Sequence, residues 1–137
     1  MSRPKTIFCD LDGTLTEHPN SGDNDITRYD LEQNMKVLPG TKEKLWEWDG
    51  KGYNIILTTG RKEGMRKSTE EQLRKAGIIY DQLIMGIGGG DRVLINDKKP
   101  DGRVAASVIN LNRDDGVKDV KIWTYKRRLG KRSIGRI

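Results

Sequence analysis

The chain has little of what usually reinforces or anchors a small protein. Its 137 residues include one cysteine, Cys9, and one histidine, His18. A single cysteine excludes an internal disulfide and a zinc site built from several cysteines, and the apolar run around Cys9 indicates a buried thiol. No apolar run approaches the ~20 residues of a membrane-spanning helix, and the first residues lack the apolar stretch of a signal peptide. We therefore expect a soluble, cytoplasmic protein with no membrane partner.

The net charge of +6 comes from the C-terminal end of the chain. Residues 126–137 contain six basic residues and no acidic one, which leaves 20 residues of each sign in residues 1–125. A basic tail can attract nucleic acid or another polyanion, although a short cationic terminus is also common as a solubilising appendage. We therefore divide the chain into one domain, residues 1–125, and a basic tail, residues 126–137.

Apolar runs alternate with helical patterns, which predicts an α/β fold with a single Rossmann-like domain: a parallel sheet flanked by helices. Strands are expected at residues 6–9, 53–58, 82–85, 93–95 and 105–110, while residues 121–125 fit either an edge strand or the start of a last helix. We expect one helix to begin with Thr41 as its N-cap, and another to cover residues 63–76 and end at Gly77. Residues 14–37 are polar and irregular, which predicts a long loop.

Two aspartates follow the first apolar run. Asp10 and Asp12 are two residues apart and run into a turn at Gly13, where backbone amides can approach a phosphate. Strand alternation places residues i and i+2 on one face. A carboxylate can attack phosphorus when a hard cation neutralises the approaching charges, so Asp10 would be the nucleophile and Asp12 would transfer protons. The alternative is a surface turn with two solvated aspartates.

Three polar residues each follow a different predicted strand. Asp10, Thr59 and Asp97 would meet at one edge of the sheet, where open parallel sheets form their sites. Asp97 would complete a Mg²⁺ site with Asp10 and the backbone carbonyl of Asp12, because this cation prefers oxygen ligands. Thr59 would donate to a phosphoryl oxygen or serve as an ordinary strand-end threonine, and Asn96 would orient Asp97 or ligate through water.

The segment from Asp10 to Leu15 resembles the first motif, DxDGT[LV], of the haloacid dehalogenase-like (HAD) phosphohydrolases. Residues 55–61 and 93–97 are similar to the second and fourth motifs, and the resemblance covers residues 5–112. It implies a small HAD-type phosphatase without a large cap domain. It also implies a flap-like insertion at residues 14–37, in which four residues would line the mouth of the site: Asp23, Asp25, Arg28 and Tyr29.

The chain departs from this family at the third motif, which is normally a lysine upstream of the fourth. No lysine lies between Gly77 and Asp97. We favour Lys99 as the replacement, although each candidate also fits a solvated surface charge; the others are Lys98, Lys67 and Arg92. Arg61, together with Gly60, could contact substrate phosphate or leaving-group oxygens, and an ion pair within the fold is an equal alternative for Arg61.

Two other features suggest no chemistry of their own. The run from Gly86 to Gly90 lacks the Lys-Ser/Thr of a P-loop and the spacing of a dinucleotide-binding loop, so we interpret it as a flexible turn between two strands. His18 lies in the long loop, where an exposed position is favoured over a role as a proton shuttle.

These features predict a Mg²⁺-dependent phosphohydrolase that cleaves a phosphate monoester through an aspartyl-phosphate. The leading substrate is a small sugar phosphate or nucleotide, and the alternative enzyme is a polynucleotide 3′-phosphatase, since an uncapped site admits large substrates. A non-catalytic module that binds a phosphorylated ligand or nucleic acid is the alternative of another class. A homo-oligomer is compatible with an uncapped site.

Overall fold

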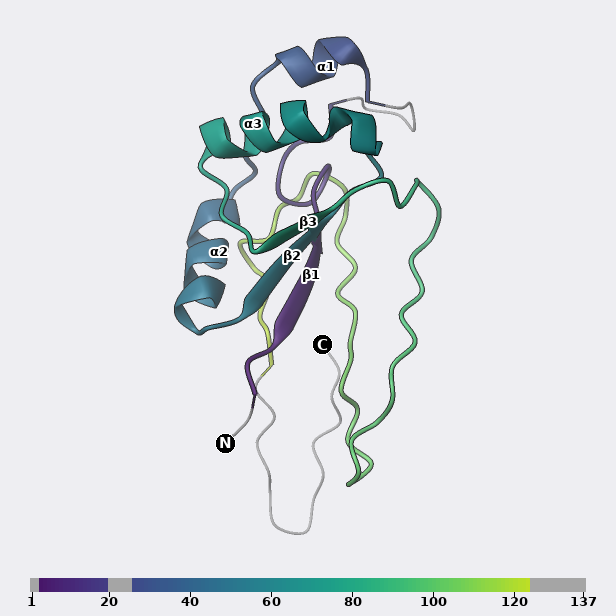
Figure 1. The fold of residues 1–137 in the computed structure, drawn as a ribbon. Helices are drawn as coiled ribbons and strands as arrows, with labels where there is room; N and C mark the ends of the chain where they lie inside the picture. The colour runs from purple at the N-terminus through teal and green to yellow at the C-terminus, as the bar shows by residue number, and fades with distance from the viewer. Residues whose placement is uncertain (1–2, 20–25, 124–137) are drawn as a thin grey trace. The chain divides into compact units, whose positions relative to one another are not determined.

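The structure is a computed structural model, and it describes residues 3–19 and 26–123. The chain forms two compact units. The first unit comprises residues 1–89 and 111–119, and the second comprises residues 90–110 and 120–137. Every helix and strand of the described residues belongs to the first unit (Figure 1). The basic tail lies outside the described residues.

A parallel sheet forms the centre of the first unit, in the order β1 (Thr6–Asp10), β2 (Asn54–Thr58) and β3 (Gln82–Ile84). The register pairs Cys9 with Leu57 and Leu57 with Leu83, so these three side chains form a row across one face, and all three are buried. These strands confirm the three predicted from the first three apolar runs. The opposite face exposes Phe8 and Ile84.

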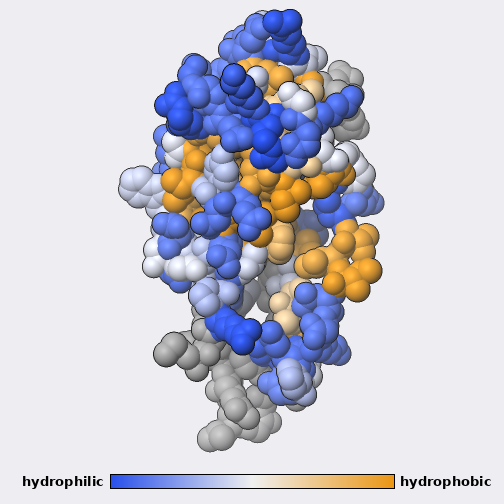
Figure 2. All heavy atoms as spheres, in the orientation of Figure 1, coloured by the Kyte–Doolittle hydropathy of each residue, from blue (hydrophilic) through white to orange (hydrophobic). Residues whose placement is uncertain are grey.

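Three helices accompany the sheet. The first, α1 (Arg28–Glu32), contacts α3 (Arg66–Ala76), and α2 (Thr41–Gly50) packs on β2 through buried Leu45 and Trp48. A short 3-10 turn, η1 (Glu63–Met65), precedes α3, and Gly77 ends α3 with φ of 72°, as predicted. Figure 2 shows hydrophilic side chains over α1 and α3 and hydrophobic ones gathered below them, over the sheet. No helix of the described residues is long and apolar enough to cross a membrane.

The structure corrects two predictions, the N-cap of α2 and the loop at residues 14–37. Gly40, in the left-handed region, is the N-cap of α2, while Thr41 is its first residue and donates its buried hydroxyl to the Leu15 carbonyl (2.6 Å). Residues 14–37 are not entirely loop, because Thr27 and Asp30 form a capping box that starts α1. Local hydrogen-bonding groups therefore initiate a helix in a segment that lacks an apolar stripe.

The strands predicted at residues 93–95 and 105–110 are absent. In the second unit, Val93 and Ile95 are 84% and 91% exposed, and residues 121–123 form neither a strand nor a helix. The second unit does contain a turn between residues 99 and 103, in which the Lys99 N–H donates to the Arg103 carbonyl (2.9 Å). A strand requires a partner for its ladder, and a short apolar run predicts burial without identifying that partner.

Candidate active site at the carboxyl end of the sheet

The first motif forms a tight turn directly after β1. The backbone N–H groups of Leu15 and Thr16 both donate to the Leu11 carbonyl, and Gly13 adopts φ of 89°. Leu11 and Leu15 are fully buried and fix this turn to the core. Because β1 ends at Asp10, the turn rather than strand alternation decides the direction of Asp12.

Asp10 stands exposed at the mouth of this turn. Its Oδ2 atom accepts a hydrogen bond from the Thr14 hydroxyl (3.1 Å). An exposed carboxylate can be approached by substrate, which a nucleophile requires. Its role as nucleophile stays a prediction.

Asp12 has a different environment, because Arg61 contacts both of its carboxylate oxygens. Arg61 Nη2 donates to Asp12 Oδ1 (2.8 Å) and Nε donates to Oδ2 (3.0 Å). The side chain of Arg61 is 2% exposed and that of Asp12 is 11% exposed. Such a bidentate pair fixes both the position and the plane of the carboxylate.

The third nitrogen of Arg61 is anchored to α3. Its Nη1 donates to Gln72 Oε1 (2.7 Å) and to the Thr69 hydroxyl (3.0 Å). Gln72 in turn donates to the carbonyls of Asp30 (2.9 Å) and Gln33 (2.7 Å), at the end of α1. The structure therefore gives Arg61 the internal ion pair that was one of its two predicted roles. Contact with substrate remains untested.

Thr59 and Gly60 complete the second motif. The Thr59 hydroxyl donates to Asp12 Oδ2 (3.4 Å) and accepts from the Arg61 backbone N–H (3.1 Å). A Cβ at Gly60 would lie 2.7 Å from the Gly88 carbonyl oxygen, and Gly86 donates to the Arg61 carbonyl (2.7 Å). Gly86 and Gly88 therefore pack against the second motif, and the run does not turn between two strands as predicted.

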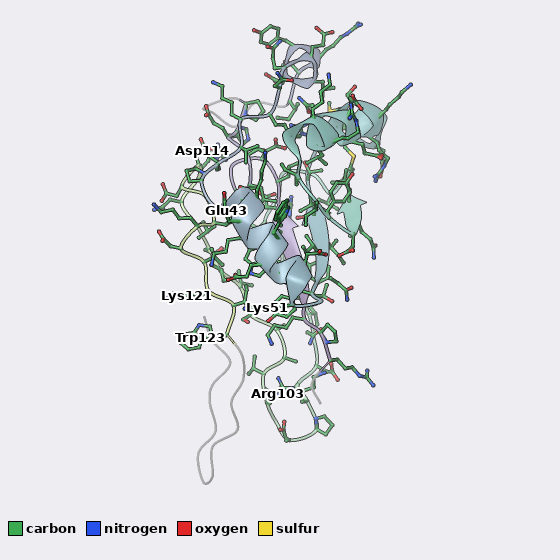
Figure 3. The ribbon with its side chains drawn as sticks, turned by 90° about the vertical axis from the view of Figure 1, so that its left-hand side faces the viewer. Glu43, Lys51, Arg103, Asp114, Lys121 and Trp123 are labelled. Atoms are coloured by element: carbon green, nitrogen blue, oxygen red, sulfur yellow. The ribbon has the colours of Figure 1, made fainter. Side chains whose placement is uncertain are left out.

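A segment near residue 114, whose polar sequence predicts a turn near the rim of the active site, completes the first-motif turn. The Asp114 N–H donates to the Gly13 carbonyl (2.8 Å), and Asp114 Oδ1 accepts from the His18 N–H (2.8 Å). Asp114, labelled in Figure 3, belongs to residues 111–119, which pass the N-terminal end of α2, where Gly116 and Lys118 pack against Pro39 and Gly40. The polar turn in its sequence was the only signal for this segment.

The other predicted residues belong to other parts of the chain. Arg28 and Tyr29 are exposed on α1, and Lys67 is exposed on α3. Asp23 and Asp25 lie outside the described residues. The second unit contains the remaining candidates, all of which are exposed: Arg92, Asn96, Asp97, Lys98 and Lys99.

The donor atoms at the turn fit a hard cation in part. The Asp10 carboxylate is an accessible oxygen ligand, whereas Arg61 already contacts both oxygens of the Asp12 side chain. Asp12 would therefore ligate Mg²⁺ through its backbone carbonyl, as the sequence suggested. Within residues 3–19 and 26–123, no three His, Cys, Asp or Glu side chains are grouped as a metal would require.

Cys9 lies one residue before Asp10, and the structure confirms that it is buried. Burial first, and the charge of Asp10 second, raise the pKa of its thiol to about 12. The thiol therefore stays protonated near neutral pH and cannot act as a nucleophile there.

Comparison with known proteins identifies the class. Residues 4–119 match the model of a family described as the polynucleotide kinase PNKP phosphatase domain. The chain is thus a HAD-like phosphatase, which confirms the family, the fold class and the enzyme class, phosphoric monoester hydrolase, that the sequence predicted. Within that class, it belongs to the family of PNKP phosphatase domains.

Solved structures include similar chains. A chain in the structure of a Pnkp1/Rnl/Hen1 complex is 34% identical with a TM-score of 0.51, and the match covers 60% of this chain but 27% of that one. A Vibrio cholerae protein is 26% identical with a TM-score of 0.47, over 67% of this chain and 79% of that one. The protein thus spans about a quarter of the chain in the complex. No curated protein sequence matches it.

Proposed function

We propose that this protein is a Mg²⁺-dependent phosphomonoesterase that forms an aspartyl-phosphate on Asp10. The observation that carries the proposal is the contrast between two neighbouring carboxylates. Asp10 is exposed beside a turn of backbone amides, while Asp12 is oriented by Arg61 and Thr59. A nucleophile needs access to substrate, and a proton-transferring group needs a fixed direction.

In this mechanism Asp10 attacks phosphorus and the bond to the leaving oxygen breaks as Asp12 delivers a proton. Asp12 then takes a proton from the water that attacks the aspartyl-phosphate, which releases inorganic phosphate and restores Asp10. The Asp10 carboxylate, the Asp12 carbonyl and Asp97 would hold Mg²⁺, which when bound offsets negative charge on the phosphoryl oxygens. Thr59 and Lys99 remain the proposed contacts of those oxygens, with Lys98, Gly60 and Arg61 as further substrate contacts.

For the substrate, we place a phosphorylated polynucleotide end ahead of a small sugar phosphate or nucleotide. The match to the family of polynucleotide kinase PNKP phosphatase domains and the 34% identity to a chain of a Pnkp1/Rnl/Hen1 complex support this order. The basic residues of the tail are compatible with it, because they would attract a polyanion.

The decisive experiment compares wild-type protein with Asp10→Asn, which removes the nucleophile and keeps the side-chain shape. Turnover of a 3′-phosphorylated oligonucleotide, a sugar phosphate and a nucleotide is measured with Mg²⁺ and with a chelator. We expect Asp10→Asn to lower turnover by several orders of magnitude, and acid quenching to trap labelled phosphate on wild-type protein only. Asp49→Asn, on the exposed side of α2, is the control. An Asp10→Asn variant with more than a few per cent of wild-type turnover would refute the covalent mechanism.

Removal of residues 126–137 separates the two substrate classes. If the tail holds a polynucleotide, truncation should weaken oligonucleotide binding and flatten its dependence on salt, because fewer counterions are released. Hydrolysis of a small ester should change little. Equal oligonucleotide affinity before and after truncation would contradict a role of the tail in substrate binding.

A further inference from the structure

The side chain of Gln72 forms hydrogen bonds both to Arg61 and to the chain segment around α1. Gln72 is 6% exposed, and the oxygen and the nitrogen of its side-chain amide bond to different partners. Its carbonyl oxygen accepts from Arg61 Nη1 (2.7 Å), while its amide nitrogen donates to the carbonyls of Asp30 (2.9 Å) and Gln33 (2.7 Å). The amide orientation is consistent with all three partners, because a guanidinium can only donate and a backbone carbonyl can only accept.

The segment that Gln72 holds has little other burial. No residue of α1 is buried, and a cavity of about 390 Å³ lies between this part of the chain and α3, lined by Asn34, Met35, Gln72, Lys75 and Ala76. Segments with few buried apolar contacts open at low free energy. Two hydrogen bonds from one buried amide therefore connect the α1 segment, residues 26–36, to α3.

The other end of Gln72 acts on Asp12 through Arg61. Arg61 uses Nε and Nη2 for Asp12, so the contacts of Nη1 decide how the planar guanidinium is rotated. Gln72 supplies one of those contacts and Thr69 supplies the other. Loss of the Gln72 acceptor would let the guanidinium tilt, and the carboxylate of Asp12 would tilt with it.

We infer that Gln72 is a positioning residue that couples docking of the α1 segment to the orientation of Asp12. This inference rests on the proposed function in one respect, the role of Asp12 in proton transfer. When the segment is docked, Gln72 is held at both ends and Arg61 orients Asp12 toward the leaving oxygen. When the segment lifts, the amide loses two acceptors and the guanidinium loses its fixed rotation.

The test uses the leaving group as the readout of Asp12. A p-nitrophenolate leaves without a proton, whereas an alkoxide requires one, so a misplaced general acid slows alkyl phosphates selectively. We expect Gln72→Met to lower kcat on an alkyl phosphate roughly 10- to 100-fold and on p-nitrophenyl phosphate no more than about threefold. A merely structural role would lower both rates equally.

A second pair of variants tests the coupling without a change at Gln72. Thr27→Ala removes the cap of α1, whose hydroxyl accepts from the Asp30 N–H (3.2 Å), and should give a weaker form of the same selective loss. Glu32→Gln removes only an exposed ion pair with Arg28 (3.4 Å) and should leave both rates unchanged. A Thr27→Ala variant without selective loss would overturn the coupling.

Hydrogen exchange tests, independently of activity, whether Gln72 holds the α1 segment against α3. Gln72→Met should speed exchange of the Leu31 and Gln33 amides, which donate to Thr27 and Asp30 within the segment. Thr69→Val removes the other acceptor of Arg61, and among the described residues the Thr69 hydroxyl has no hydrogen bond to the segment, so exchange there should stay at the wild-type rate. Equal exchange rates of the Leu31 and Gln33 amides in wild type and Gln72→Met would show that Gln72 does not hold the α1 segment. A wild-type protein inactive on every ester would refute the proposed function while leaving this result valid.

Discussion

Two arginine–carboxylate pairs in the first unit have the same geometry and different surroundings. Arg61–Asp12 and Arg66–Glu63 both form two-point contacts, with shortest N–O distances of 2.8 Å. The side chains of the first pair are 2% and 11% exposed, and those of the second are 36% and 62% exposed. Water screens the second pair, whereas the first has exchanged its hydration for protein partners. Short distances alone therefore do not identify which pair matters.

The largest effect should come from breaking the buried pair on one side. Asp12→Asn leaves the Arg61 charge buried without a counter-ion, which we expect to lower the free energy of unfolding by ~3–5 kcal/mol. Urea unfolding of Asp12→Asn, Arg61→Met and the double variant measures this. The double variant should be less destabilised than the sum of the two single ones, and strict additivity would mean that the two groups do not interact.

A smaller effect is expected from Arg61→Lys, which keeps the charge and removes the planar fork. An ammonium group cannot contact both Asp12 oxygens while also reaching Thr69 and Gln72, so we expect a loss of about 2 kcal/mol in the free energy of unfolding. The same unfolding assay applies. A fully stable Arg61→Lys variant would show that charge alone, and not the fork, holds Asp12.

Cys9 tests whether burial, without an ion pair, makes the free energy of unfolding depend on pH. Its folded pKa of about 12 lies above the ordinary 9.0. Its contribution to stability is therefore fully present below pH 9 and is lost as the pH rises toward 12, by about 1 kcal/mol at pH 10. Cys9→Ala should remove this part of the alkaline decline, measured as the difference between the two unfolding curves at pH 8 and 10. Parallel declines would contradict a raised pKa.

The exposed pairs should give the smallest effect. Hydrogen bonds from Arg66 and Arg74 lower the pKa of Glu63 and Glu71, so any stabilisation exists above the ordinary carboxyl pKa of 4.5 and disappears as the pH falls below it. At neutral pH we expect Glu63→Gln and Glu71→Gln to leave the urea midpoint unchanged within error, at low and at high salt. A shift as large as that of Arg61→Lys would remove the distinction between the two kinds of pair.

The sequence predicted those parts of the fold that depend on short-range pattern. Strands β1, β2 and β3 follow from apolar runs, and α3 follows from a helical stripe that ends at Gly77. The stripe also contained the missed signal: Thr69 is polar, belongs to the buried face, and stands three residues before Gln72. Two buried polar groups one turn apart need a polar partner, and Arg61 is that partner.

Other parts depend on contacts that a local pattern does not encode. The sequence could not decide whether Arg61 contacts substrate or forms an internal ion pair. The residues of α3 that anchor Arg61 and the end of α1 come together only in the folded protein. The apolar run at Val93 to Ile95 matched a strand by composition, but composition does not supply a ladder partner. The polar residues around Asp114 predict a turn near the active-site rim, but they do not predict its contact with Gly13.

The contacts of Asp114 have a consequence for how the protein is made. They join residues about one hundred positions apart in the chain, so this part of the first-motif turn cannot form until the second half of the molecule has been synthesised. Closing so long a loop carries an entropy penalty and slows folding, whereas β1, β2 and α3 can associate earlier. We therefore expect a nascent chain released after α3 to contain Asp10, Asp12 and Arg61 and still lack the completed turn.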